Sequence, residues 1–356
     1  MNINLTPLET CENFCNKLGI SPPIKFELLG HGEYNINYRI RLRDDEKASN
    51  ICNWQKAAVL PLLRIPMGSQ MHLENQVRYE YEALQLLQPS GRTPAPLYLD
   101  DTKSVIPYGF SVMSFLTGRP LCYETDLSAA AECLADIHAL PIPDNTHLIA
   151  PQKPLAAMLD ECNTMSLHYL KSDQGLPEVK QLIRELLENG RKLAENEPPI
   201  TKRNIINTEL NSSNFLVNPD KTYLVDWEKP LYASYGQDLG HFLAPTTTLW
   251  KTDTILTQTE IQSFIETYAT SGKAAFHRLH ASTSRSYEQF PSPEQIWAET
   301  RPYFIMTCLR GITWCAMAWI EYQSPDRPLK DEFTFNKLKH YLQPEFLEFI
   351  KKEYFT

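Results

Sequence analysis

The hydrophobic pattern of this chain changes about a third of the way along, and the change restricts the folds that it can adopt. Up to about residue 116 the chain contains short apolar runs, which are typical of β-strands where turn residues separate them. They lie at Lys25–Leu29, Tyr38–Leu42, Ala57–Ile65 and Gly109–Phe115. With 356 residues, the chain also exceeds the length that a single core usually serves. We therefore predict an α+β protein with a small β-rich N-lobe, residues 1–116, and a larger, mainly helical C-lobe, residues 117–356.

Helical periodicity fills most of the remaining sequence. Apolar residues recur every three to four positions in these segments, which indicates amphipathic helices. After an N-terminal helical segment they are Gln76–Gln88, Leu127–Leu140, Glu178–Glu195, Glu260–Thr270, Tyr303–Tyr322 and Phe333–Tyr341. Within the helical part, two short apolar runs flank Asn-Pro-Asp-Lys-Thr, whose residues favour turns, and predict a β-hairpin near residues 214–227. We place the hinge between the lobes at Thr117-Gly118-Arg119-Pro120.

Composition excludes several classes of protein. No run of about 18 apolar residues occurs, so no membrane-spanning helix is predicted. The N-terminus carries acidic residues and lacks the basic and apolar regions of a signal segment. The 8 cysteines form no C-x-x-C pair, and we expect most of them to be reduced thiols inside cores. These features predict a cytoplasmic protein without a membrane partner, and they leave the oligomeric state open.

Charge is distributed unevenly along the chain. The net charge is −9; residues 1–119 balance 12 acids with 12 bases, whereas residues 120–356 hold 31 acids and 22 bases. A nucleic-acid-binding protein needs a basic patch, and none is present, so we predict no nucleic-acid partner. The acidic second part favours a cationic substrate through its field, although a solvated acidic surface would give the same count.

A glycine-containing turn joins the first two predicted strands. Gly30 and Gly32 precede Asn35 there, and glycines let a backbone lie close to a ligand with its N–H groups directed at phosphate oxygens. Two glycines in a hairpin are also consistent with a simple turn.

The third predicted strand carries a cation among apolar residues. Arg64 lies in Ala-Ala-Val-Leu-Pro-Leu-Leu-Arg-Ile-Pro, and a charge in so apolar a segment needs a partner. Glu80, on the following helix, is the candidate. In kinase-type sites a strand cation holds the nucleotide phosphates and is itself held by a glutamate of a helix. A surface ion pair is the alternative.

The strongest motif lies around the predicted hairpin. Glu209 precedes Asn214 by five residues, Asn214 opens the first strand of the hairpin, and Asp226 follows the second. Phosphoryl transfer needs a carboxylate that orients the attacking hydroxyl, together with oxygen ligands for Mg²⁺. This order of residues predicts that Glu209, Asn214 and Asp226 meet at one strand end. A polar hairpin with acidic ends explains the residue types but not their joint spacing.

Seven motifs of the chain, in order from about residue 25 to about residue 245, resemble those of the aminoglycoside phosphotransferase and choline kinase family. The segments are Gly32–Tyr38, Leu63–Pro66, Tyr79–Leu84, Ser111–Gly118, Leu134–Leu140, Asn207–Asn214 and Leu224–Glu228. They resemble the family's nucleotide loop, its strand with the basic phosphate ligand, its helix with the pairing glutamate, its hinge, its L-A-x-x-H-x-L helix, and its H-G-D-x-x-x-x-N and D-W-E signatures. Asp238-Leu239-Gly240 further resembles the D-L-x motif, in which the aspartate hydrogen-bonds the catalytic loop.

The resemblance implies a protein-kinase-like, two-lobed fold and an ATP- and Mg²⁺-dependent kinase. Its substrate would be a small molecule with a hydroxyl group, with a cationic one favoured. Glu209, Asn214 and Asp226 would be catalytic, with Asn214 and Asp226 as metal ligands. The nucleotide would be bound by Gly30, Gly32, Asn35, Arg64, Glu80 and the hinge residues Met113, Ser114 and Phe115.

The chain departs from the family where the family has His-Gly-Asp. It has Asn207-Thr208-Glu209 instead, so the catalytic carboxylate is one methylene longer, and Arg64 replaces a lysine. Two alternatives therefore stay open: a catalytically silent nucleotide-binding or scaffold protein, and an enzyme of kinase fold that transfers AMP. The sequence leaves the acceptor and the choice between ATP and GTP undetermined.

Overall fold

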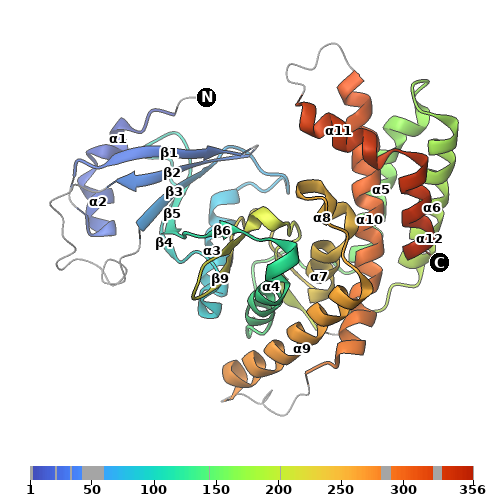
Figure 1. Cartoon of the computed structure of the whole chain (residues 1–356). Helices are drawn as coiled ribbons and strands as arrows, with labels where there is room; N and C mark the ends of the chain where they lie inside the picture. The colour runs from blue at the N-terminus through green and yellow to red at the C-terminus, as the bar shows by residue number, and fades with distance from the viewer. Residues whose placement is uncertain are drawn as a thin grey trace. The chain divides into compact units, whose positions relative to one another are not determined.

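A computed structural model describes residues 3–20, 22–32, 34–41, 60–143, 145–200, 202–281, 290–323 and 331–355 of the chain. The chain forms two compact units (Figure 1). The sheet unit comprises Met1–Leu121, Leu140–Leu148 and Asn214–Pro230, and the helical unit comprises Cys122–Ala139, Ile149–Ser213 and Leu231–Thr356. The lobe boundary after residue 116 stays a prediction. Glu33 of the predicted glycine turn and Cys52 lie outside the described residues.

An antiparallel sheet of five strands forms the first part of the sheet unit, in the order β1-β2-β3-β5-β4. Its strands are β1 (Lys25–His31), β2 (Asn35–Arg41), β3 (Leu60–Pro66), β4 (Pro96–Asp100) and β5 (Phe110–Phe115). Four of them match predicted runs, but β4 was missed. Pro96 opens β4, and β4 is an edge strand, which is where a proline is tolerated although its sequence signals a break.

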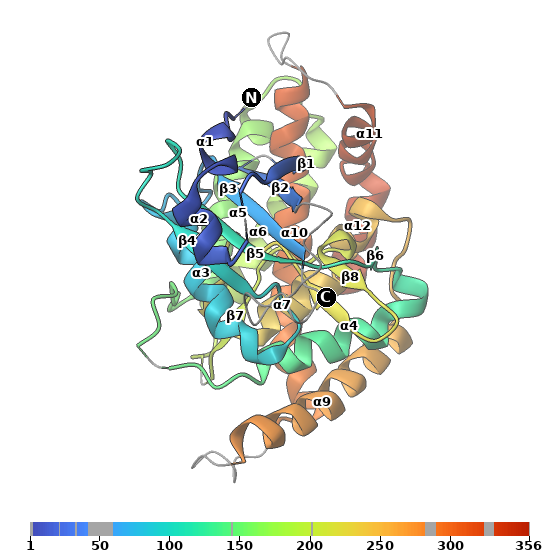
Figure 2. The ribbon, with the colours of Figure 1, turned by 90° about the vertical axis from the view of Figure 1, so that its left-hand side faces the viewer.

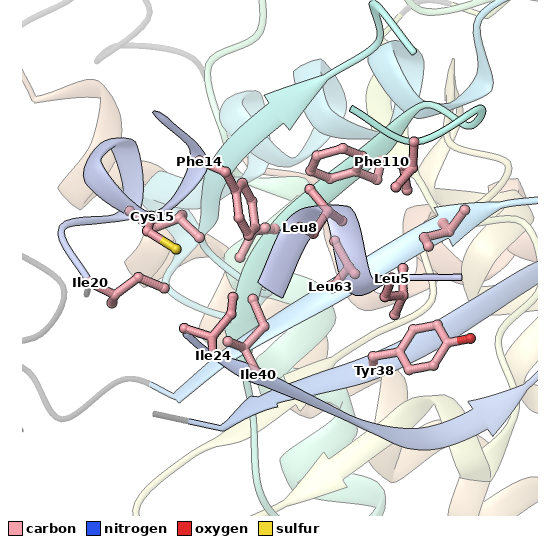
Figure 3. Close-up of a cluster of buried hydrophobic side chains, with 14 of the residues drawn as sticks. Leu5, Leu8, Phe14, Cys15, Ile20, Ile24, Tyr38, Ile40, Leu63 and Phe110 are labelled. Carbon is pink, nitrogen blue, oxygen red and sulfur yellow. The ribbon is translucent and has the colours of Figure 1, made fainter. Parts of the chain in front are cut away.

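Two short helices, α1 (Thr6–Glu9) and α2 (Glu12–Leu18), cover one face of the sheet (Figure 2). Their apolar side chains meet alternate residues of the strands, because successive side chains of a strand point to opposite faces. Figure 3 shows this core, which includes Leu5, Leu8, Phe14, Cys15, Ile24, Tyr38, Ile40, Leu63 and Phe110. Leu63 and Ile65 both belong to it, so Arg64 between them faces the other side.

The helix predicted at Gln76–Gln88 is present as α3 (Gln76–Leu87). It packs against β3, β4 and β5. The predicted hairpin is also present, as β8 (Phe215–Val217) and β9 (Thr222–Leu224), with β6 (Arg119–Pro120) beside β8. Two hydrogen bonds fix the hairpin to the sheet unit: Leu224 N–H donates to Arg92 O over 2.8 Å, and Tyr79 O–H donates to Pro230 O over 2.7 Å. The strand ends with Asp226 therefore belong to the sheet unit.

The helical unit combines its helices with a two-stranded sheet of β7 (Asn204–Ile206) and β10 (Leu231–Ala233). The helices are α4 (Tyr123–His138), α5 (Pro154–Lys171), α6 (Pro177–Glu195), α7 (Tyr235–Leu243), α8 (Pro245–Lys251), α9 (Gln258–His280), α10 (Pro293–Gln323), α11 (Glu332–Tyr341) and α12 (Pro344–Tyr354). Helix α10 lies alongside α5 and α6, and α12 packs on α6 (Figure 1).

Four of these helices, α5, α7, α8 and α12, were not predicted. The segment His241–Trp250, in which no helix was predicted, contains the end of α7 and most of α8. Prolines open α5, α8 and α12. At the first position of a helix a proline loses no intrahelical hydrogen bond. Because proline also interrupts helices and strands, the sequence alone does not show that a helix begins there.

Helix α10 is, among the described residues, the one helix long and apolar enough by composition to cross a membrane, with a mean hydropathy of 1.3 in its most apolar window. The sequence predicted a helix over Tyr303–Tyr322, and α10 extends this helix in both directions, to Pro293 and to Gln323. In the structure 67% of that window is buried inside the protein, as expected for the core helix of the helical unit.

The cysteines agree with the prediction of reduced thiols. All seven in the described residues are free, and five of them, Cys15, Cys133, Cys162, Cys308 and Cys315, are buried.

Gly240 lets α7 approach α10 closely. A Cβ atom at this position would lie 2.5 Å from the backbone nitrogen of Phe304, a distance that real side chains do not adopt. Because α7 also carries Asp238, this contact fixes part of the candidate site.

We expect Gly240→Ala to lower the free energy of unfolding by about 1–3 kcal/mol, since backbone atoms have to move to admit the methyl group. Urea unfolding followed by circular dichroism measures the change. Gly30→Ala is the matched control, because a Cβ there meets nothing within 4 Å. Equal stability of the two variants would contradict the close contact.

Candidate functional site

Arg64 and Glu80 form a buried ion pair in the sheet unit. Arg64 Nε donates to Glu80 Oε2 over 2.8 Å, and the two side chains are 8% and 5% exposed. Arg64 lies on β3 opposite Asn37 of β2 and Ser111 of β5, in the middle of the sheet. The predicted pairing is confirmed, and the alternative of a surface ion pair is wrong, because both charges lie inside the protein.

Two further carboxylates reach the same guanidinium from the end of the hairpin. Arg64 Nη2 lies 3.2 Å from Asp226 Oδ1 and 2.9 Å from Glu228 Oε1. Glu228 also accepts a hydrogen bond from Asn35 Nδ2. Three carboxyl groups thus surround one cation.

This crowding affects the proton affinities of the cluster. Burial and the neighbouring charge of Asp226 raise the pKa of Glu228 to about 7, against the opposing effect of Arg64. Burial lowers the pKa of Arg64, but the carboxylates of Glu80, Asp226 and Glu228 raise it by more, so that it lies above its ordinary value. The guanidinium is therefore a permanent charge at any physiological pH.

The glycine turn lies at the start of β2. Gly32 N–H donates to Asn35 O over 2.8 Å, and a Cβ at Gly32 would lie 3.2 Å from Asn35 Oδ1, so the turn passes close to the Asn35 side chain. Gly30 lies on β1 just after an irregularity in its pairing with β2. A side chain at Gly30 would meet nothing within 4 Å.

The predicted hinge residues Met113, Ser114 and Phe115 end β5. Ser114 N–H donates to Ala95 O over 2.9 Å, and its hydroxyl accepts from Ala95 N over 2.8 Å. The Ser114 N–H is thus engaged within the sheet unit. A nucleobase would have to use other backbone groups of this segment.

Asn214 and Asp226 lie side by side at the base of the hairpin. Val225 N–H donates to Asn214 O over 2.9 Å, and Asp226 is the next residue. Asp226 has a positive φ of 63°, which is uncommon for a non-glycine residue and turns the chain sharply. Its side chain is 45% exposed although it lies near Arg64.

These two residues suit Mg²⁺, which binds through one or two protein oxygen ligands and keeps several waters. The excess negative charge around Arg64 also favours a divalent cation. Among the described residues no group of three or more His, Cys, Asp and Glu side chains could hold a metal by itself. The donor set therefore fits a cation shared with a phosphate better than a closed structural site.

Glu209 lies in the helical unit, in a loop held by Asp238 of α7. The carboxylate of Asp238 is fully buried and accepts the N–H groups of Asn207 and Thr208, each over 2.8 Å. His138 Nε2 lies 3.2 Å from the same carboxylate. The prediction that Asp238 hydrogen-bonds the backbone of this loop is confirmed.

Thr208 has a positive φ of 74°, so the loop turns sharply just before Glu209. Asn207, at the position of the family's histidine, accepts the Glu209 N–H with its side-chain oxygen over 3.2 Å.

His241 of α7 provides a second attachment for this loop. Its Nδ1 lies 2.8 Å from Leu210 O, which assigns the proton to Nδ1. Burial, followed by the charge of Arg310, lowers the pKa of His241 to about 4. Its neutral ring can hold the Leu210 carbonyl at neutral pH.

Arg310 of α10 is paired with Glu161 of α5 through two hydrogen bonds of 2.8 and 3.1 Å. Trp314 is 38% exposed and meets Trp250 edge to face, with ring centroids 5.2 Å apart. Burial lowers the pKa of Arg310, but the charge and hydrogen bonds of Glu161, followed by the charge of Glu209, raise it above its ordinary value.

The structure thus gathers Asn35, Arg64, Glu80 and Asp226 in the sheet unit and gives Glu209 to the helical unit. Three contributors were missed as functional residues. Glu228 was quoted within the D-W-E motif without a role, Gln76 holds Glu80 over 2.7 Å, and His241 holds the loop of Glu209. Only the glutamine had a local signal, because it lies four residues before Glu80 on one helix face.

The lowered pKa of His241 predicts a pH dependence of stability. The unfolded chain has the ordinary pKa of 6.5 and binds a proton below it that the folded chain does not bind until about pH 4. Stability from this residue is therefore complete above pH 6.5 and falls as the pH drops toward 4, by about 3 kcal/mol.

We expect His241→Asn, which keeps a side-chain N–H for the Leu210 carbonyl, to lose less stability than wild type between pH 7 and pH 4.5. Urea midpoints at several pH values measure this difference. The exposed His168 supplies the control, His168→Asn. Parallel pH curves for wild type and His241→Asn would contradict the buried neutral imidazole.

Solved structures share this fold. A choline kinase from Cryptosporidium parvum has a TM-score of 0.59 at 14% identity, with 96% of this chain and 95% of that chain covered. A spectinomycin phosphotransferase in complex with ADP and spectinomycin gives 0.56 at 14% identity, with 94% of both chains covered. An ethanolamine kinase from Plasmodium vivax gives 0.54 at 14% identity, with 91% and 84% covered. At such identities the likeness concerns the fold alone, and no curated protein sequence matches the chain.

The predicted kinase-like fold, a five-stranded antiparallel sheet followed by a mainly helical region, is confirmed by these structures. A sequence model of the phosphotransferase enzyme family matches residues 31–281, which include Gly32 of the glycine turn, the Arg64–Glu80 pair, the hairpin and Asp238. The chain belongs to the phosphotransferase enzyme family.

Proposed function

We propose that this phosphotransferase is an ATP- and Mg²⁺-dependent kinase that phosphorylates a hydroxyl group of a small molecule. The observation that carries the proposal is the buried Arg64–Glu80 pair with Asp226 beside it. A cation fixed by a helix glutamate and placed next to a metal-binding aspartate is the arrangement that phosphoryl transfer requires. We further expect the protein to act in the cytoplasm.

The sheet unit would bind the nucleotide. Gly30 and Gly32 would let the turn before Asn35 lie near the phosphates, and Arg64 would donate its remaining N–H groups to them. The segment Met113–Phe115 would meet the adenine. The ADP bound by the related spectinomycin phosphotransferase supports an adenine nucleotide.

Asn214 and Asp226 would hold the metal ion. A bound Mg²⁺ neutralises the charge of the phosphate oxygens and fixes their orientation. The exposed carboxylate of Asp226 and the adjacent Asn214 supply oxygen ligands, and Arg64 keeps Asp226 in place from one side. The carboxylates around Arg64 would disfavour a nucleotide without a divalent cation.

Glu209 would orient the acceptor hydroxyl and accept its proton. The sharp turn at Thr208 and the anchoring of the loop by Asp238 and His241 support a fixed position for this carboxylate. A glutamate side chain is one methylene longer than that of an aspartate. A loop whose backbone lies correspondingly farther from the acceptor hydroxyl would therefore place the carboxylate oxygen at the same distance from it. Loop position and side-chain length would then compensate.

The acceptor would be a small molecule with a hydroxyl group, and a cationic one is favoured by the acidic C-terminal part of the chain. Choline, ethanolamine and aminocyclitols, named for the structural relatives, are the first compounds to test. Incubation with γ-labelled and α-labelled ATP separates kinase activity from AMP transfer. Nucleotide binding with no transfer to any acceptor would indicate the silent alternative.

We expect Asp226→Ala to lower turnover by at least about 100-fold, because it removes a charged ligand from the site where transition-state charge develops. A coupled assay of ADP release measures the rate, and circular dichroism checks the fold, since Asp226 also pairs with Arg64. Wild-type turnover in a folded variant would remove Asp226 from the site.

We expect Glu209→Gln to lower kcat by about 100- to 10,000-fold, the usual contribution of a general base, with little change in the affinity for ATP. Glu178→Gln, at an exposed position on α6, is the control and should retain full activity. Undiminished kcat in Glu209→Gln would show that Glu209 is not the base.

A further inference from the structure

Glu228, two residues after Asp226, accepts three hydrogen bonds from other parts of the sheet unit. Its Oε1 atom accepts from Arg64 Nη2 over 2.9 Å and from Asn35 Nδ2, while its backbone oxygen accepts from Gln76 Nε2 over 2.8 Å. The side chain is 14% exposed. Glu228 therefore links the end of the hairpin to β2, β3 and α3 at once.

The five N–H groups of Arg64 are divided among its neighbours in a definite way. Nε donates to Glu80, and Nη2 donates to Asp226 and Glu228. Within the described part of the chain no hydrogen bond involves Nη1, and Nη1 is absent from the buried atoms that lack a partner. Two N–H groups of a fixed, planar guanidinium thus remain for a ligand, in the fork that suits phosphate oxygens.

We propose that Glu228 is the positioning residue of the nucleotide-phosphate site, which holds Arg64 and Asn35 in register so that Arg64 Nη1 faces the phosphates. This inference rests on the proposed function only for the identity of the ligand. Without Glu228, Asp226 would be the sole partner of Nη2, and Asp226 would be divided between Arg64 and the metal. With Glu228 present, the orientation of the guanidinium does not depend on Asp226 alone.

The same geometry assigns different tasks to the two acids of the Asp-Trp-Glu motif. Oε1 of Glu228 already accepts two N–H donors, which hold this carboxyl group against Arg64 and Asn35, and its side chain is only 14% exposed. The carboxylate of Asp226 is 45% exposed and has one longer contact of 3.2 Å with Arg64. Asp226 is therefore the metal-facing acid and Glu228 the positioning acid.

The proposal also explains why an arginine serves on β3. The ammonium of lysine is a single point of charge. Its three N–H donors sit on one atom, so Glu80, Glu228 and a phosphate would all have to approach that atom, whereas a guanidinium presents a separate edge to each of them. The positioning role of Glu228 therefore depends on an arginine at position 64.

Four variants test the proposal. Glu228→Gln keeps the accepting oxygen, Glu228→Asp keeps the charge but shortens the reach, and Glu228→Leu removes both. Glu82→Leu, on the partly exposed side of α3, is the control for an acid-to-leucine change. Melting curves establish which variants fold, and Glu228→Asp serves in place of Glu228→Leu if the latter does not.

The first readout needs no nucleotide. In protein labelled with ¹⁵N-arginine, the side-chain Nη–H signal of Arg64, assigned by its loss in Arg64→Lys, reports whether the Nη2 group that donates to Glu228 is held. We expect a slowly exchanging signal in wild type, Glu228→Gln and Glu82→Leu, and a shifted or broadened one in Glu228→Asp and Glu228→Leu. An unchanged signal in Glu228→Asp and Glu228→Leu would overturn the positioning role.

The second readout is the dissociation constant of ADP, measured by calorimetry with and without Mg²⁺. We expect Glu228→Gln to stay within about threefold of wild type, and Glu228→Asp and Glu228→Leu to bind ADP about 10- to 100-fold more weakly with Mg²⁺ present. Asp226→Asn should instead lose the effect of Mg²⁺. If Glu228→Gln loses the effect of Mg²⁺ as Asp226→Asn does, Glu228 is a metal ligand and the proposal fails.

Failure of wild type to bind ADP would count against the proposed function alone, because the Arg64 signal would still decide whether Glu228 positions the guanidinium.

Discussion

A permanent positive charge inside a sheet needs carboxylates around it, and in this protein that requirement connects the elements of the candidate nucleotide site. Arg64 lies on the opposite side of β3 from the core of Leu63 and Ile65, so it cannot reach solvent through the apolar layer under α1 and α2. Glu80 approaches it from α3, and Asp226 and Glu228 approach from the hairpin. One guanidinium thereby joins the strand, the helix and the hairpin that phosphoryl transfer needs close together.

The second constraint is the backbone of the loop that carries Glu209. Asp238 accepts two consecutive N–H groups of this loop from a fully buried position, and His138 Nε2 contacts the Oδ2 atom that also accepts Asn207 N–H. A buried carboxylate is stable only with such donors, so the helix and the loop fix each other. His241 adds a hydrogen bond to the Leu210 carbonyl, and Gly240 lets α7 lie against α10. Replacement of the family's histidine by Asn207 therefore leaves the loop well supported.

The residues of the sheet unit and those of the helical unit fix their parts of the candidate site in different ways. In the sheet unit the charges are crowded, and one acid, Glu228, keeps the geometry of the others. In the helical unit the interactions are mostly between side chains and backbone, and they fix the backbone position from which the Glu209 side chain extends. A longer side chain at position 209 is compatible with such a loop, because the backbone position and the side-chain reach can change together. The departure from the family pattern is thus compatible with a working site.

The sequence by itself determined the order of strands and helices in outline, the pairing of Arg64 with Glu80, and the support of the loop by Asp238, because each depends on local pattern or on a motif of fixed spacing. It missed β4, α5, α8 and α12, each of which begins with a proline, a residue that marks breaks as well as first positions. Only the tertiary structure decided that Glu228 bridges Arg64 and Asn35, and that His241 holds Leu210. These contacts join residues far apart in the chain or across the turn of a helix, and their hydrogen bonds depend on the packing of whole elements, which no local pattern encodes.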